Sequence, residues 1–185
     1  WALGASVRRQ DGNTIRLDEG EPMSALDGAT PLEVQVAPGT AMLIKREVFE
    51  KVGLLDESFF LYYEEIDWCL KVRRAGYRIL AVPTSVIWHK VSATLGQTSP
   101  VIDYYMLRNQ LLFTSHHWAG LARLSVQARI VLRNTATIMA YTVYNHGGQR
   151  LPHRNARLLA LRDAALGRWG RMGPDVEAIC YLAKR

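Results

Sequence analysis

The sequence contains few of the residues that would indicate a disulfide-bonded, zinc-binding or membrane-spanning protein. Its two cysteines, Cys69 and Cys180, form no CxxC pair and lie in no Cys/His cluster at zinc spacing. No apolar run reaches the ~18 to 20 residues that span a bilayer. Because the two cysteines indicate no disulfide framework, we expect the protein in a reducing compartment. Because the chain begins at Trp1 with neither an initiator methionine nor a signal peptide, we expect a processed chain or part of a longer one.

Acidic residues are scarce in the last third of the chain. Residues 121–185 contain 11 Lys or Arg and 3 Asp or Glu, whereas residues 1–120 contain 12 and 14. Hydrophobic residues make up 49% of the 185 positions and charged residues 22%, which is a globular composition. The net charge of +6 therefore belongs to a basic C-terminal third that follows a mildly acidic body.

Hydrophobic patterning predicts an α/β body at residues 1–100 and a helical, basic appendage at residues 101–185. The connection is expected in the polar stretch 90–100, and a Gly/Asn turn predicts a hairpin near the N-terminus. The expected strands are 5–9, 14–17, 32–36, 41–44, 77–82 and 85–88. The expected helices are 46–52, 64–75, 101–116, 121–144 and 155–169.

Three carboxylates, on Glu64, Glu65 and Asp67, follow an aromatic loop and open the helix expected at 64–75. Acidic groups in a first turn complement the helix dipole, which is a purely structural role. Crowding beside aromatic walls would instead raise one pKa and create a general base. The pattern leaves both interpretations open, and it places Asp67 and Lys71 for an i,i+4 ion pair.

His89 ends the last expected strand of the body. A single histidine is usually a packed or solvated residue. A neutral imidazole at a strand terminus also suits a divalent metal or an oxyanion. The start of the acidic helix and the end of this strand could converge on one sheet edge, where α/β proteins bind ligands.

The order of these motifs resembles the acceptor-side half of family 2 glycosyltransferases with the GT-A fold, and within them the bacterial rhamnosyltransferase-like branch. The similarity is dense between residues 36 and 113. It is carried by the segments 39–60, 63–79, 82–83, 89 and 108–113, and more loosely by 161–170.

The resemblance implies roles for individual residues. The second member of the family's acidic pair is the general base; here it is Glu65, preceded by Glu64. Since the family usually has aspartate at that position, Asp67 is a reserve candidate. The family's histidine after the strand pair helps to hold a divalent metal, Mg or Mn, which assigns His89 to that role. Most of the metal's ligands would lie outside this chain.

The resemblance also implies substrate-binding residues. Gly39 and Thr40 fall where family members line the donor-sugar pocket. Tyr62, Tyr63 and Trp68 are candidate walls for the acceptor, because sugar rings stack on aromatic faces. Ordinary core packing is the alternative for each of these three rings.

The resemblance further implies an inverting transfer of a sugar, with rhamnose a candidate, from a nucleotide-sugar donor to a lipid-linked or cell-surface polysaccharide acceptor. The family also needs an N-terminal donor half with an Asp-x-Asp motif, and none occurs in this sequence. We therefore expect the chain to be the C-terminal portion of such an enzyme, inactive alone. The rival hypothesis is a non-catalytic, membrane-associated scaffold that kept the fold without the donor site.

The basic appendage has an apolar side and an arginine-rich side on the helix expected at 155–169. Leu158, Leu159, Leu161, Leu166 and Trp169 form the apolar side. The pattern favours binding to an anionic membrane surface, at the cytoplasmic inner face of the cell membrane. An arm that packs on another part of the protein or in a homo-oligomer is the alternative. Nucleic acid is disfavoured, because no binding motif accompanies the arginines.

Overall fold

The computed structural model describes residues 4–17, 30–89 and 98–182, apart from the side chains of Arg16, Leu17, His146 and Leu182. The chain divides into two compact units. The first consists of residues 1–56 and 64–90, and the second of residues 57–63 and 91–185. The polar connection expected at 90–100 lies largely outside the described residues. Sequence patterns did not indicate that the segment 57–63 belongs with the C-terminal helices.

The first unit contains the expected N-terminal hairpin. Strands β1 (Gly4–Val7) and β2 (Thr14–Leu17) pair antiparallel. Gly12 takes the left-handed conformation that the turn requires, with φ of 72°. The Asp11 carboxylate accepts hydrogen bonds from the Arg8 guanidinium and from the Asn13 backbone N–H, which fixes the turn.

A second pair of strands in this unit is shorter than the patterning predicts. Strands β3 (Leu32–Val34) and β4 (Ile79–Ala81) pair antiparallel. The strands expected at 41–44 and 85–88 are wrong, since both segments are irregular. An apolar run forms a buried strand only when a neighbour pairs with its backbone. Among the described residues neither run has such a partner, and Leu43 and Trp88 are exposed.

Two helices complete the first unit, and both confirm the expected positions. Helix α1 is Arg46–Val52 and helix α2 is Glu64–Arg74. Gly53 and Gly76 follow them with φ of 87° and 90°, the left-handed conformation in which glycine ends a helix. Val48, Trp68 and Val72 form the buried core that holds the two helices together.

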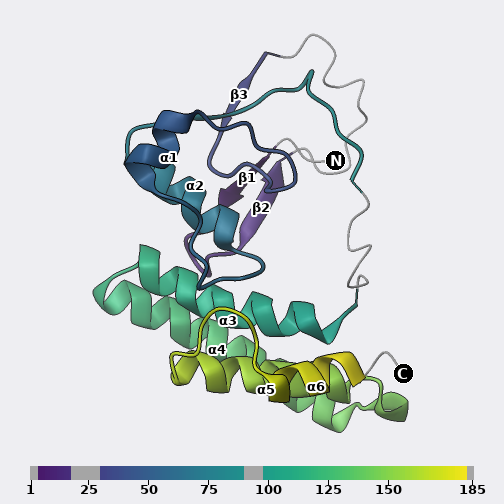
Figure 1. Ribbon diagram of the computed structural model, residues 1–185. Helices are drawn as coiled ribbons and strands as arrows, with labels where there is room; N and C mark the ends of the chain where they lie inside the picture. Colours follow the sequence, from purple (N-terminus) through teal and green to yellow (C-terminus); the bar gives the residue numbers. More distant parts are fainter. Residues whose placement is uncertain (1–3, 18–29, 90–97, 183–185) are drawn as a thin grey trace. The chain divides into compact units, whose positions relative to one another are not determined.

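The second unit is helical (Figure 1). It contains α3 (Pro100–His117), α4 (Gly120–Val143), the short 3-10 helix η2 (His146–Gly148), α5 (Leu151–Ala165) and α6 (Pro174–Leu182). Helices α3 and α4 match the prediction closely. Helix α5 begins four residues early because Pro152 suits a first helical turn, and it ends before Gly167 (φ 65°). Helix α6 was not predicted.

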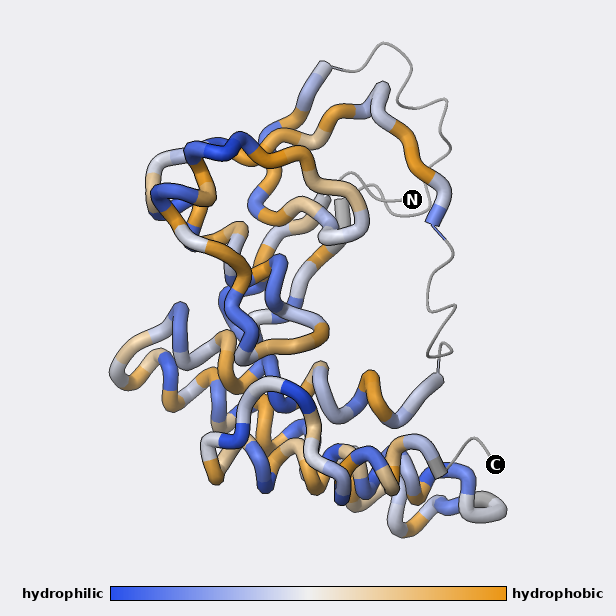
Figure 2. Tube along the Cα trace, viewed as in Figure 1, coloured by the Kyte–Doolittle hydropathy of each residue, from blue (hydrophilic) through white to orange (hydrophobic). Residues whose placement is uncertain are grey.

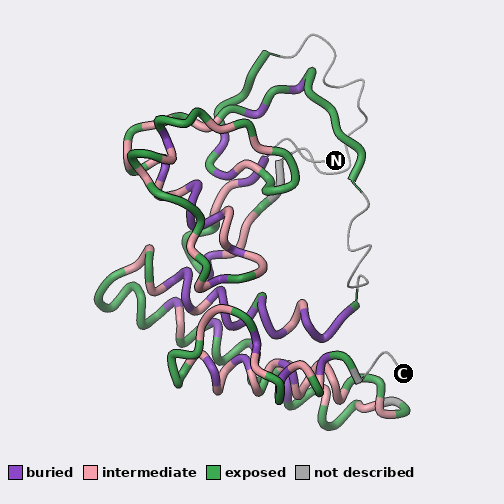
Figure 3. Tube along the Cα trace, in the orientation of Figure 1, coloured by how far each residue is buried: buried purple, intermediate pink, exposed green. Residues whose placement is uncertain are grey.

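Helix α3 is the centre of this unit and contacts α4, α5 and α6. Figure 3 shows it as largely buried, and Figure 2 shows apolar and polar residues interspersed along the surrounding helices. The mixed α/β composition expected from the sequence is confirmed, with the strands confined to the first unit. Within the described ranges, no helix has the length and apolar character needed to cross a membrane.

Candidate active site

The first turn of α2 carries two carboxylates with raised pKa values. The side chains of Glu64 and Glu65 are partly exposed, yet one oxygen of each, Oε2, is buried and accepts no hydrogen bond from the described residues. Burial raises the pKa of both groups, and the neighbouring Glu64 charge raises the pKa of Glu65 further. Such a carboxylate is prepared to accept a proton.

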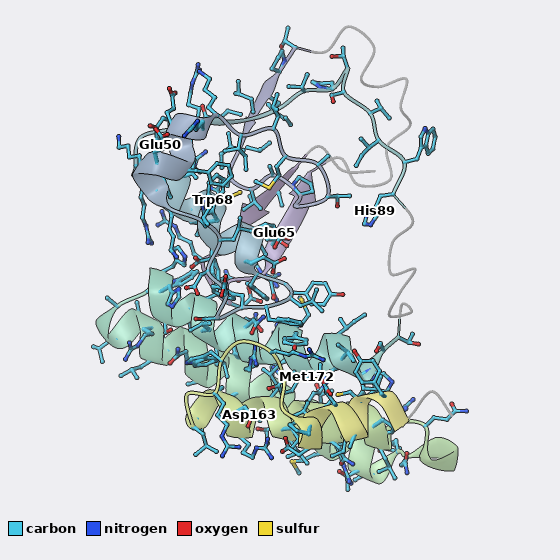
Figure 4. All side chains as sticks on the ribbon, in the orientation of Figure 1. Glu50, Glu65, Trp68, His89, Asp163 and Met172 are labelled. Atoms are coloured by element: carbon cyan, nitrogen blue, oxygen red, sulfur yellow. The ribbon has the colours of Figure 1, made fainter. Side chains whose placement is uncertain are left out.

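The turn at residues 37–40 brings two more of the predicted site residues to this carboxylate. A β-carbon on residue 39 would lie 3.4 Å from Glu65 Cβ, so glycine lets the turn pass directly beside Glu65. The next residue, Thr40, places its hydroxyl 3.5 Å from His89 Nδ1. The turn therefore contacts Glu65 on α2 through Gly39 and His89 after β4 through Thr40. Figure 4 labels Glu65 and His89, the two residues that the turn contacts in distant parts of the sequence.

Asp67 has a different environment from the two glutamates. Its side chain is fully buried, and its Oδ2 lies 2.6 Å from Lys71 Nζ, which confirms the predicted i,i+4 pair. Asp67 is therefore tied to Lys71 in the interior of the first unit, whereas Glu64 and Glu65 are partly exposed.

Trp68 is a core residue of the first unit. Core packing was the alternative to its predicted role as a wall for the acceptor. The residue is 3% exposed, and its ring packs against Phe49 with centroids 5.3 Å apart. The indole Nε1–H donates a 2.8 Å hydrogen bond to the Gly53 carbonyl. These contacts are those of a residue that joins α1 to α2, rather than of a sugar-stacking platform.

Tyr62 and Tyr63 belong to the second unit, in a loop with unusual backbone conformations. Phe60, Tyr62 and Tyr63 have φ of 61°, 65° and 74°, a region that side-chain-bearing residues rarely occupy. Tyr63 is 2% exposed and packs on Phe113, whereas Tyr62 is only partly buried. Such conformations persist only where surrounding contacts enforce them, and they concentrate at functional sites.

Asn109 on α3 provides those contacts, and sequence reasoning missed it as a site residue. Its fully buried side-chain amide donates to the carbonyls of Phe59, Leu61 and Tyr62 at 2.8, 2.7 and 2.9 Å. Its Oδ1 accepts from the guanidinium of Arg108, which is also fully buried. A signal existed in the sequence, because Arg108, Asn109 and Gln110 form a polar run between apolar residues of α3.

The predicted site residues thus separate into groups. Glu64, Glu65, Gly39, Thr40 and His89 lie together in the first unit, whereas Asp67 and Trp68 are tied into its interior. The exposed His89 imidazole suits a divalent cation, and its contact with Thr40 can orient the ring. One histidine is too few ligands to hold Mg²⁺ or Mn²⁺, so the donor set fits a metal that is bound mainly by other groups.

Comparison with known proteins finds several relatives that are named as sugar transferases, all at low identity or over a short part of the chain. The chain is 25% identical over 155 residues to the dTDP-rhamnosyl transferase RfbF of Shigella flexneri, a match that covers 80% of this chain and 51% of that protein. The chain resembles glycosyltransferases. It is 50% identical over 46 residues to the low-salt glycan biosynthesis hexosyltransferase Agl10 of Haloferax volcanii, covering 25% of this chain and 15% of the relative.

A third relative is the N-acetylglucosaminyl-diphospho-decaprenol L-rhamnosyltransferase of Mycobacterium tuberculosis. It is 25% identical over 100 residues, which cover 52% of this chain and 33% of that protein. The chain therefore spans about half of the first relative and less of the other two. No family model and no solved structure matches the chain. By their names, all three relatives transfer rhamnosyl or hexosyl groups.

Proposed function

We propose that this chain is the acceptor-side part of an inverting, family 2-like glycosyltransferase of the GT-A fold. A nucleotide sugar is the donor, with rhamnose the candidate sugar, and Glu65 is the general base. The observation that carries the proposal is the buried, unpartnered Oε2 of Glu65 beside Gly39, in the same region as Thr40 and His89. The rhamnosyltransferases among the relatives support the choice of sugar.

In this mechanism the acceptor hydroxyl donates its proton to the Glu65 carboxylate as its oxygen attacks the anomeric carbon of the donor. The bond from that carbon to the nucleoside diphosphate breaks, and the configuration inverts. Burial raises the pKa of Glu65 and so makes it a better base than a solvated glutamate. Glu64 adds to this effect through its neighbouring negative charge.

The other residues of the region bind and orient. Gly39 leaves space next to the carboxylate, and Thr40 offers a hydroxyl to the sugar and to His89. His89 would contribute one ligand to a divalent cation that arrives with the donor. Mg²⁺ or Mn²⁺, when bound, stabilises the charge on the departing nucleoside diphosphate.

The donor half and most of the metal ligands lie outside these 185 residues in this proposal, so the chain alone would not turn over. The proposed acceptor is a lipid-linked or cell-surface glycan. Support comes from the mycobacterial relative, whose name specifies a sugar on a diphospho-decaprenol carrier.

The deciding experiment is Glu65→Gln in the polypeptide that also carries the donor half. Sugar transfer should fall at least a hundredfold, because general-base catalysis contributes about 10²- to 10⁴-fold, while donor binding is kept. Glu50→Gln is the matched control, since Glu50 is an exposed glutamate of α1 paired with Arg46 (Figure 4). Full activity of Glu65→Gln would overturn the assignment, and a protein in which neither variant nor wild type transfers sugar would favour the scaffold hypothesis.

A further inference from the structure

The aromatic loop at residues 57–63 belongs to the second unit and presents one of its rings to solvent. Phe59 and Tyr63 are buried, whereas Phe60 is 53% exposed. The Phe60 ring stacks on the fully buried ring of Tyr105 in α3, with centroids 5.6 Å apart and an interplanar angle of 26°. Phe60 therefore rests on a buried ring and leaves about half of its own surface open to a ligand.

The backbone of Phe60 has a conformation that favours glycine. Its φ is 61°, in the left-handed region where the β-carbon of an L-residue crowds the backbone. Tyr63, with φ of 74°, is in the same region, but its side chain is buried against Phe113 and serves the core. Core packing does not account in the same way for the half-exposed Phe60, at a position where glycine would be unstrained. A strained residue whose side chain the core does not need indicates a ligand site.

Hydrogen bonds within the second unit hold the loop in this conformation. The Phe60 N–H donates to the Glu57 carbonyl at 3.1 Å, and the Gly170 N–H donates to the Ser58 carbonyl at 2.7 Å. The Asn109 amide adds the three bonds described above. The Phe60 ring is therefore fixed in place in the absence of a ligand, so that stacking on it costs the loop little conformational entropy.

A sugar ring fits a single exposed aromatic ring of this kind. The C–H groups on one face of a pyranose form a small apolar patch with partial positive charge, which complements the negative face of an aromatic ring. A protein partner fits less well, because Phe60 is the only exposed apolar residue of the loop 57–63, whereas a stable interface buries about 800 Å² on each partner. We propose that Phe60 is a binding platform for a sugar ring of the acceptor glycan. The assignment of that sugar to the acceptor rests on the proposed function.

Saturation-transfer NMR on the 185-residue chain tests the binding platform. The probes are methyl α-L-rhamnopyranoside and N-acetylglucosamine at about 10 mM, which populates complexes with millimolar Kd. We expect at least one probe to bind. Phe60→Leu keeps an apolar side chain but removes the aromatic face, so it should weaken binding about fivefold, whereas Phe60→Trp should keep it. The matched control is Tyr144→Leu, which removes a ring that is 62% exposed elsewhere in the second unit and should bind like the wild type.

Three results in this assay would overturn the inference. The first is that neither probe binds the wild type. The second is that Phe60→Leu binds as well as the wild type, and the third is that Phe60→Leu and Tyr144→Leu weaken binding equally. Circular dichroism confirms the folding of each variant, and Phe60→Trp distinguishes loss of the aromatic face from any change in the loop, because it keeps an aromatic ring at the same strained position.

Kinetics of the polypeptide that also carries the donor half separate this inference from the proposed function. With the better-binding probe as acceptor, Phe60→Leu should raise KM for the acceptor about fivefold and leave KM for the nucleotide sugar unchanged. If Glu65→Gln abolishes transfer but Phe60→Leu leaves the acceptor KM unchanged, the proposed function stands and the acceptor platform is wrong. If the wild type transfers no sugar while Phe60→Leu still weakens probe binding, the proposed function is wrong and the sugar-binding platform stands.

Discussion

The amide of Asn109 is the group whose removal should reveal most about how the aromatic loop is held. Its two N–H groups serve the carbonyls of Phe59, Leu61 and Tyr62, all within 2.9 Å. In Asn109→Leu the side chain keeps its approximate volume, so little cavity forms. The variant loses the three donated hydrogen bonds and the two that Oδ1 accepts from the buried Arg108 guanidinium, at about 1 kcal/mol for each bond.

The expected loss in the free energy of unfolding is therefore about 5 kcal/mol. This is a large part of the 5–15 kcal/mol that stabilises a typical domain. The assay is urea unfolding followed by far-ultraviolet circular dichroism, which reports on the helices of the second unit. Asn145→Leu is the control: Asn145 is only partly buried and accepts a 3.3 Å bond from Arg150 N–H, so we expect a change below about 1 kcal/mol.

Asn109→Asp separates the two hydrogen-bonding roles of this side chain. Aspartate keeps an oxygen for the Arg108 guanidinium but presents a second oxygen, instead of an N–H donor, to the three carbonyls. If the amide donors hold the loop, this variant should still lose about 3 kcal/mol, for the three donated hydrogen bonds, although it keeps the acceptor for Arg108. An Asn109→Asp protein as stable as the wild type would refute the reasoning, because acceptance from Arg108 would then be the function of the residue.

Three further predictions concern the first unit. Gly39→Val should lower sugar transfer at least tenfold in the donor-containing protein while changing unfolding by less than about 0.5 kcal/mol, since its side chain meets Glu65 at an exposed turn. Transfer should rise with pH as Glu65 loses its proton. The stability contributed by protonated Glu64 and Glu65 is present below pH 4.5 and lost as pH rises through their raised pKa values; Glu65→Gln should flatten the transfer profile and leave only the Glu64 contribution to the stability profile. Lys71→Met should lower the free energy of unfolding, measured in urea, by about 3 kcal/mol, because the buried Asp67 carboxylate loses its ion pair with Lys71. A change near zero would contradict a stabilising role for this ion pair.

The sequence correctly predicted the helices and the hairpin whose ends are marked by characteristic residues. Gly53 and Gly76 end α1 and α2 at the expected places, and the Asp11-Gly12-Asn13 turn closes the N-terminal hairpin. The i,i+4 pair of Asp67 and Lys71 was equally predictable, because helix geometry alone brings these positions together. These features depend on contacts within a few residues.

Strands were predicted less well, because an apolar run forms a strand only when a neighbouring segment pairs with its backbone. Residues 41–44 and 85–88 have the composition of buried strands, but the described part of the chain supplies no pairing partner, and Leu43 is exposed. Likewise, leucine spacing on α5 indicated an amphipathic helix but could not tell which side faces the core. Packing within the second unit partly buries Leu159 and Leu161, whereas Leu158 and Leu166 are exposed.

The sequence by itself determined the acidic cluster, the basic C-terminal third and most helix positions, because these follow from residue type and short spacing. The choice of Glu65 as candidate base rested instead on the resemblance to a known family. Only the tertiary structure decided that Gly39 lies against Glu65 and that Thr40 contacts His89. It also decided that Asn109 holds a loop some 50 residues earlier in the chain. Long-range contacts of this kind arise from packing of whole elements, which no local pattern specifies.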